Sequence, residues 1–141
     1  MAEPMPDDDT HAVLAANRSF YDAFNAGDFA AMAALWAEQT PVACIHPGWE
    51  ALTGREAVLD SWRRLLGQAR GPRIAFRHSV TQAHDGCVFV LGQELVAGAT
   101  LAATNAFVEE AGRWRIVLHQ ASQIAHAMPW RDTPPSGSSL H

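Results

Sequence analysis

Residues 73–124 decide the fold, and they read RIAFRHSVTQAHDGCVFVLGQELVAGATLAATNAFVEEAGRWRIVLHQASQI. Apolar and polar residues alternate through much of this stretch, which is typical of β-strands. Short glycine-containing pairs at residues 85–86, 98–99 and 111–112 interrupt the alternation, and such pairs are typical of hairpin turns. The sequence therefore predicts four consecutive antiparallel strands, over residues 73–84, 87–97, 100–109 and 113–124.

The first half of the chain has a helical period instead. Apolar residues recur three or four positions apart over residues 11–26, 29–36 and from 53 or 54 to 66. A short strand is expected at residues 42–46, with a loop over residues 47–52 after it. Helices followed by strands indicate an α+β fold. No connection between the late strands is long enough for a helix, so all three helices are expected to cover one face of the sheet.

Composition limits the remaining possibilities. The 141 residues suffice for one domain, expected at residues 10–127 between disordered tails at residues 1–9 and 128–141. The net charge of −5 and the scattered arginines disfavour nucleic-acid binding. No apolar run approaches the roughly 20 residues that span a membrane. Cys44 and Cys87 have no metal-ligand spacing, and they fit reduced thiols in the cytoplasm.

Several segments resemble one known superfamily. Residues 20–29 (FYDAFNAGDF), 52–58 (LTGREAV) and 112–122 (GRWRIVLHQAS) look like the corresponding parts of nuclear transport factor 2-like and SnoaL-like proteins. The ending also resembles the association domain of calcium/calmodulin-dependent protein kinase. The resemblance implies a cystatin-like cone: a curved antiparallel sheet that wraps around three N-terminal helices, encloses a pocket and forms a homodimer through its convex face. One fold of this kind serves many functions, so function must come from the site.

Ketosteroid isomerase, a member of this superfamily, uses a carboxylate base with a tyrosine and a protonated aspartate as donors. The alignment places Phe20 at the tyrosine position, with Tyr21 one residue away, about 100° around the helix. Asn105 takes the aspartate position, and residues 44–46 contain no acid for the base. The resemblance therefore disfavours the steroid isomerase mechanism.

A different set of polar residues is expected at the pocket. Strand alternation places Asn105 and His119 on the concave face, and a turn at residues 98–99 would set Glu94 opposite Ala103 on that same face. The candidates for general acid/base catalysis are His46, Glu94 and His119. Glu94 and His119 could instead simply satisfy each other, or join His46 in a metal site. The expected pocket lining is His46, Trp49, Asn105, Phe107, Val117 and His119.

Two functions fit these features. The leading hypothesis is a homodimeric small-molecule pocket protein, for example a lyase or isomerase that acts on an apolar oxygenated substrate, with no cofactor and no metal. The alternative is a non-catalytic module for dimerisation or ligand sensing. The homodimer is expected to use Leu118, Gln120 and Ser122 on the convex face, since the last strands carry apolar residues on both faces.

Overall fold

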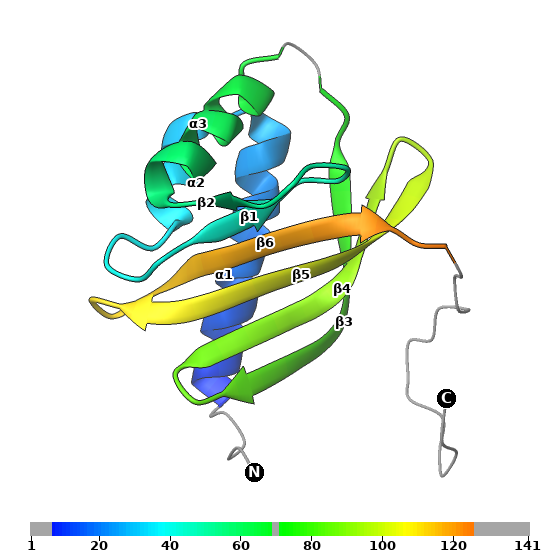
Figure 1. Cartoon of the computed structure of the whole chain (residues 1–141). Helices are drawn as coiled ribbons and strands as arrows, with labels where there is room; N and C mark the ends of the chain where they lie inside the picture. Colours follow the sequence, from blue (N-terminus) through cyan, green and yellow to red (C-terminus); the bar gives the residue numbers. More distant parts are fainter. Residues whose placement is uncertain (1–6, 69–70, 126–141) are drawn as a thin grey trace, which may run out of the picture.

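The computed structural model describes residues 7–68 and 71–125, which form three helices and a six-stranded sheet (Figure 1). This arrangement confirms the predicted α+β class. None of the helices in these two ranges is both long and apolar enough to cross a membrane. In chain order the elements are α1 (Asp7–Ala26), α2 (Phe29–Leu35), β1 (Ala43–Ile45), β2 (Leu52–Thr53), α3 (Arg55–Leu66), β3 (Ile74–His84), β4 (Cys87–Val96), β5 (Ala99–Glu110) and β6 (Arg113–Gln123).

The four long strands pair antiparallel in chain order, as the hairpin signals predict, and α1 passes behind them in Figure 1. The sheet order is β2-β1-β6-β5-β4-β3. Strand β1 joins β6 in parallel, with Cys44 beside His119, so the sheet is mixed rather than wholly antiparallel. Parallel pairing needs a long connection, and here everything between residues 45 and 118 provides it. The two-residue strand β2 lies in the segment predicted as loop and helix start.

Helix α1 begins earlier than predicted. It starts at Asp7 and takes in residues 7–9, which the sequence assigned to a tail. Acidic residues are favourable in a first helical turn because they face the positive end of the helix dipole. Asp28 caps α2, since its carboxylate accepts a hydrogen bond from the Ala31 backbone N–H at 3.0 Å. The predicted tail at residues 128–141 lies outside the described residues.

The β4–β5 hairpin turns one residue earlier than predicted. Val96 pairs with Ala99, so the turn residues are Ala97 and Gly98, both with positive φ as a tight two-residue hairpin turn requires. Glu94 consequently lies opposite Leu101 instead of Ala103. The correction is a shift of two residues, which leaves every side chain on its predicted face.

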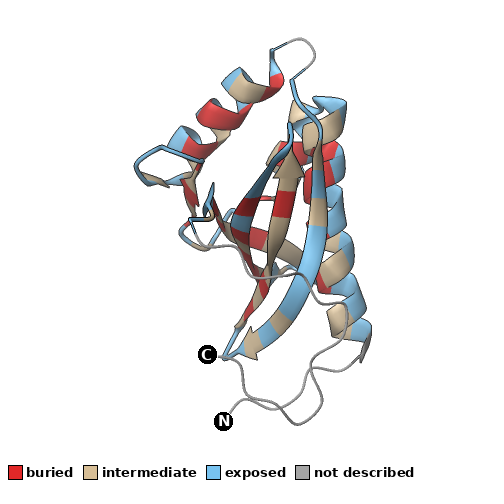
Figure 2. Ribbon diagram, turned by 90° about the vertical axis from the view of Figure 1, so that its right-hand side faces the viewer, coloured by how far each residue is buried: buried red, intermediate tan, exposed pale blue. Residues whose placement is uncertain are grey.

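The core lies between the sheet and the helices, where the buried residues gather in Figure 2. Trp36, Phe107 and Ile116 are fully buried there. A bulge in β6 adjusts the sheet to this core: Ala106 pairs with Leu118, but Phe107 pairs with Ile116, so Val117 has no partner of its own.

A carboxylate fastens the β5–β6 hairpin to the loop after α2. Glu110 accepts hydrogen bonds from the backbone N–H groups of Glu38, Gln39 and Thr40 at 2.8–3.0 Å, and from the Thr40 hydroxyl at 2.8 Å. These bonds, led by the one from Glu38, hold the pKa of the Glu110 carboxyl below its ordinary value. Its contribution to stability is therefore present above the ordinary carboxyl pKa and is lost as the pH falls through the lowered one.

We expect Glu110→Gln to lower the melting temperature at neutral pH, because an amide places a donor against a row of backbone donors. The difference from wild type should shrink in strong acid, where the wild-type carboxyl is also protonated. Differential scanning calorimetry across pH measures both effects. Glu109→Gln, the exposed neighbour on the same strand, is the matched control. Equal melting of Glu110→Gln and wild type at neutral pH would contradict this role.

Candidate functional site

An apolar cavity of about 300 Å³ lies between the sheet and helices α1 and α3. Strands β3–β6 supply one wall, and the loop after β1 supplies another. Two buried polar side chains of the sheet, Glu94 and His119, face this space. The lining residues are Phe24, His46, Pro47, Trp49, Trp62, Leu65, Gln68, Gly71, Pro72, Ile74, Glu94, Val96, Leu101 and His119.

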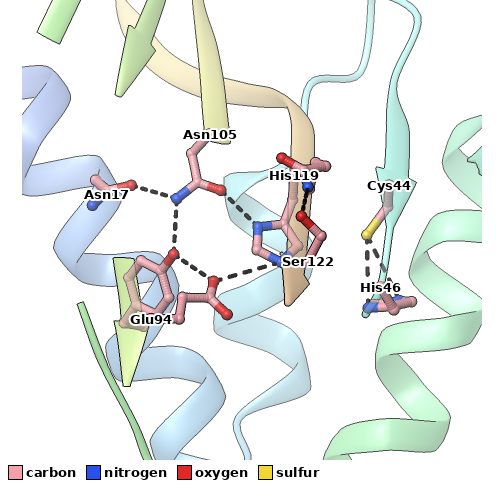
Figure 3. Close-up of polar contacts among 9 residues, drawn as sticks. Asn17, Cys44, His46, Glu94, Asn105, His119 and Ser122 are labelled. Carbon is pink, nitrogen blue, oxygen red and sulfur yellow. Dashed lines mark hydrogen bonds and ion pairs between the residues drawn. The ribbon is translucent and has the colours of Figure 1, made fainter. Parts of the chain in front are cut away.

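The Glu94 carboxyl belongs to a ring of polar contacts among buried side chains (Figure 3). The Tyr21 hydroxyl donates to Glu94 Oε2 at 2.7 Å, and Asn105 Nδ2 donates to that hydroxyl at 3.0 Å. Asn105 Nδ2 also donates to Asn17 Oδ1 at 2.8 Å. His119 closes the ring, with Nδ1 at 2.6 Å from Asn105 Oδ1 and Nε2 at 3.7 Å from Glu94 Oε2. Each of these side chains is almost completely removed from solvent.

Burial sets the protonation of this ring. It raises the pKa of the Glu94 carboxyl, partly offset by the hydrogen bond from Tyr21. It also lowers the pKa of His119 to about 3, with a further contribution from nearby His46. Burial and the charge of Glu94 both raise the pKa of Tyr21, which keeps its proton. The pKa shifts of Glu94 and His119 both favour a neutral acid and a neutral imidazole over an ion pair.

His46 belongs to a second buried group on the opposite wall. The Ser61 hydroxyl donates to the Val58 carbonyl at 2.7 Å, so its oxygen accepts a hydrogen from His46 Nε2 at 2.9 Å. Burial lowers the pKa of His46 to about 4, which leaves Nδ1 as an unprotonated acceptor. Cys44 lies beside the imidazole, but burial and Glu94 raise the pKa of its thiol to about 12, so it is a poor nucleophile.

The structure brings together only part of the predicted site. His46, Trp49, Glu94 and His119 line the cavity, with Trp49 44% exposed at its edge. Asn105 lies one layer behind and reaches the cavity only through His119 and Tyr21. Two further predicted lining residues do not line it either. Phe107 is fully buried in the core, and Val117 lies at the bulge, where the alternation of faces breaks.

Sequence reasoning missed two site residues on helices. Tyr21, set aside because it is one position from the family's tyrosine, points at Glu94 and stacks on Phe76 with ring centroids 4.9 Å apart. Gly92 permits this stack, since a Cβ there would lie 2.5 Å from the Phe76 ring. Trp62, one of the apolar residues in the helical pattern that ends at residue 66, also lines the cavity, and its buried indole N–H has no protein acceptor among the described residues. An unpaired indole donor cannot be recognised from sequence.

A larger hollow of about 410 Å³ lies between α1 and β3. Its lining includes the exposed, charged or polar residues Arg18, Asp22 and His78, and although Asn17 and Tyr21 also reach it, the Glu94–His119 pair lies outside it. We therefore take the smaller apolar cavity as the candidate site, because it combines buried titratable groups with apolar walls.

The geometry disfavours the metal-site alternative. No group of three or more ligating side chains within residues 7–68 and 71–125 could hold a metal ion. The rings of His46 and His119 are 6.5 Å apart, and Ser61 engages His46 Nε2.

Comparison with known proteins yields a family and several structural relatives. The SnoaL-like domain matches residues 13–126. A candidate dehydratase of the nuclear transport factor 2-like family from Streptomyces avermitilis is 28% identical, with a TM-score of 0.76 over 86% of this chain and 100% of the other. A protein of unknown function with a cystatin-like fold from Nostoc punctiforme has a TM-score of 0.73 at 15% identity over 87% of this chain and 96% of that one, so the predicted fold is confirmed.

Two further relatives have names that refer to other roles. A candidate calcium/calmodulin-dependent protein kinase type II association domain from Thiobacillus denitrificans is 33% identical, with a TM-score of 0.70 over 88% of this chain and 98% of that one. The F-box protein SKIP8 of Arabidopsis thaliana is 28% identical over 115 residues, 80% of this chain. This chain spans only half the length of that curated relative.

Proposed function

The chain belongs to the SnoaL-like domain family, and from this premise we propose that it is a lyase or isomerase that acts on a small apolar, oxygenated substrate without a cofactor. The observation that carries the proposal is Glu94, a carboxyl only 2% exposed that faces an apolar cavity. A buried carboxyl with a raised pKa, beside a neutral imidazole, is suited to proton transfer near neutral pH.

The two groups have complementary roles in such chemistry. An isomerisation needs a group that removes a proton from one carbon and returns it to another, and an elimination needs a base together with an acid for the departing oxygen. Glu94 is the group suited to exchange a proton with the substrate, because burial raises the pKa of its carboxyl. His119 Nε2, 3.7 Å from it, presents a lone pair, and its pKa of about 3 makes it a hydrogen-bond acceptor for a substrate hydroxyl rather than a strong base. The similarity to a candidate dehydratase supports an elimination.

A second candidate is a non-catalytic binding or dimerisation module. The hydrogen bonds that link Glu94, Tyr21, Asn105 and His119 Nδ1 support it, because these groups largely satisfy one another without a ligand. The similarity to a candidate kinase association domain points the same way.

One experiment separates the two candidates. Wild-type protein is incubated in heavy water with β-hydroxycyclohexanone, whose ring carbons next to the carbonyl bear acidic hydrogens. An acid/base enzyme should speed deuterium incorporation at those carbons, loss of water, or both, as mass spectrometry reports. Binding of the compound, seen by amide NMR at cavity residues, with no acceleration of either reaction would favour the binding module.

We also propose that the chain forms a homodimer through the sheet face opposite the cavity. Leu118 and Gln120 alternate with the inward-facing His119, and Phe89 and Leu91 share their face by strand register. Half-buried apolar side chains gathered on one face support a protein interface.

Sedimentation at micromolar concentration should show a dimer, and Leu118→Arg should shift it to monomer without loss of fold. Ser19→Arg, at an exposed position of α1, is the control. A monomeric wild type would contradict the proposal.

A further inference from the structure

We propose that Glu94 and His119 form a hydroxyl-binding subsite, and that the cavity takes a small uncharged alcohol with a compact apolar body. The inference rests on the proposed function, since it names the substrate class of the same cavity. Three features of the site carry it: the direction of the hydrogen bonds, the distance between the two groups, and the composition of the walls.

The hydrogen bonds fix which atoms face the ligand. The Asn105 amide nitrogen donates its two hydrogens to Asn17 and Tyr21, which leaves the amide oxygen, an acceptor, facing His119. His119 Nδ1 therefore carries the imidazole hydrogen, and Nε2 presents a lone pair. The Tyr21 hydrogen goes to Glu94 Oε2. Among these groups His119 Nε2 is left as a bare acceptor, and the Glu94 carboxyl, whose Oε1 bonds no other member of the ring, is a donor when it is protonated.

The distance between these two groups determines which kind of ligand atom can bind to both of them. At 3.7 Å, Glu94 Oε2 and His119 Nε2 are too far apart for a direct hydrogen bond. An oxygen about 2.8 Å from each would bond both. A hydroxyl fits both roles, because it donates to Nε2 and accepts from the carboxyl proton. A carbonyl oxygen can only accept, and it would leave the Nε2 lone pair without a donor.

The residues that line the cavity disfavour charged ligands, and its volume excludes large ones. Among the lining residues in the described part of the chain there is no lysine or arginine, and their aromatic and aliphatic side chains carry no charge to balance a carboxylate. Burying an unpaired anion there would be strongly unfavourable. A volume of about 300 Å³ is at the small end of ligand pockets. It corresponds to a single ring with a short substituent.

Four probes of one shape test the inference: benzyl alcohol, benzaldehyde, toluene and benzoate. Each is titrated at millimolar concentration into the wild-type protein and into His119→Phe, and binding is followed by amide NMR at cavity residues. We expect wild type to bind benzyl alcohol about fivefold more tightly than toluene, as one net hydrogen bond provides. Benzaldehyde should be weaker than the alcohol, and benzoate should not bind. His119→Phe should lose the preference for alcohol over toluene.

The outcomes separate this inference from the proposed function. Equal binding of benzyl alcohol and toluene, or binding of benzoate as tight as that of the alcohol, would overturn the hydroxyl subsite while leaving a small-molecule cavity. Absence of binding by all four probes would overturn both. The wild-type titrations decide the matter even if His119→Phe does not fold.

Discussion

The free energy of unfolding is expected to fall as the pH is lowered from about 6.5 toward 4.5, because two buried histidines each contribute up to about 1.4 kcal/mol per pH unit and Glu94 opposes them. This slope is the net effect of three buried groups. His46 and His119 have pKa values of about 4 and about 3 in the folded chain, below the ordinary 6.5, and burial raises the pKa of Glu94 above 4.5.

The direction of this pH dependence follows from the number of protons that the folded and unfolded chains bind. Between pH 4.5 and 6.5 the unfolded chain holds a proton on each histidine that the folded chain lacks, so both histidines make stability rise with pH. Glu94 acts in the opposite direction, because the folded carboxyl keeps a proton that the unfolded one releases. Where the folded Glu94 carboxyl stays protonated, two groups against one leave a net difference of one bound proton, which is a slope of about 1.4 kcal/mol per pH unit.

Two variants separate these contributions. Glu94→Gln should steepen the slope to about 2.7 kcal/mol per pH unit, because neither histidine owes its lowered pKa to Glu94. His46→Gln should bring the slope close to zero. Urea unfolding at a series of pH values measures each slope, with the exposed His78→Gln as control. If Glu94→Gln left the slope unchanged, the folded carboxyl would be ionised in wild type, and the neutral pair would be wrong.

The sequence predicted the sheet better than the helix ends. Hairpin signals and alternation placed the four long strands to within one or two residues, because both depend on local turn chemistry and on a period of two. The pairing of β1 with β6 joins residues more than 70 positions apart, and no local pattern encodes it. The β4–β5 turn was misplaced because Ala97 adopts a positive φ, which alanine rarely does.

The same reasoning explains the outcome at the site. Strand parity placed Glu94 and His119 on the cavity face, and the misplaced turn did not move them because the error was an even number of residues. Val117 was misplaced by the bulge in β6, which interrupts parity without any glycine to mark it. Phe107 keeps the parity of Asn105 on β5, but it is buried in the core and does not reach the cavity. Tyr21 was missed because its role depends on how α1 is rotated against the sheet, which tertiary packing decides.

Glu94→Gln is expected to lower any proton-transfer rate on β-hydroxycyclohexanone by about 10²- to 10⁴-fold. Glutamine retains the shape of the side chain and can accept the Tyr21 hydrogen, but it cannot exchange a proton with the substrate. Binding of the compound, measured by amide NMR, should change far less than the rate. Glu109→Gln, exposed on β5, is the control for loss of one carboxylate.

Tyr21→Phe tests whether the phenol acts through Glu94. The Tyr21 hydrogen bond lowers the pKa of Glu94, so its removal should raise that pKa further. The limb of the pH–rate profile that reports Glu94 should then move to higher pH, an effect that loss of packing alone would not produce. A profile of unchanged position with a uniformly lower rate would limit Tyr21 to packing.

Equal rates in wild type and Glu94→Gln would remove Glu94 from the chemistry and favour the binding module, because no other carboxyl lines the cavity within the described residues.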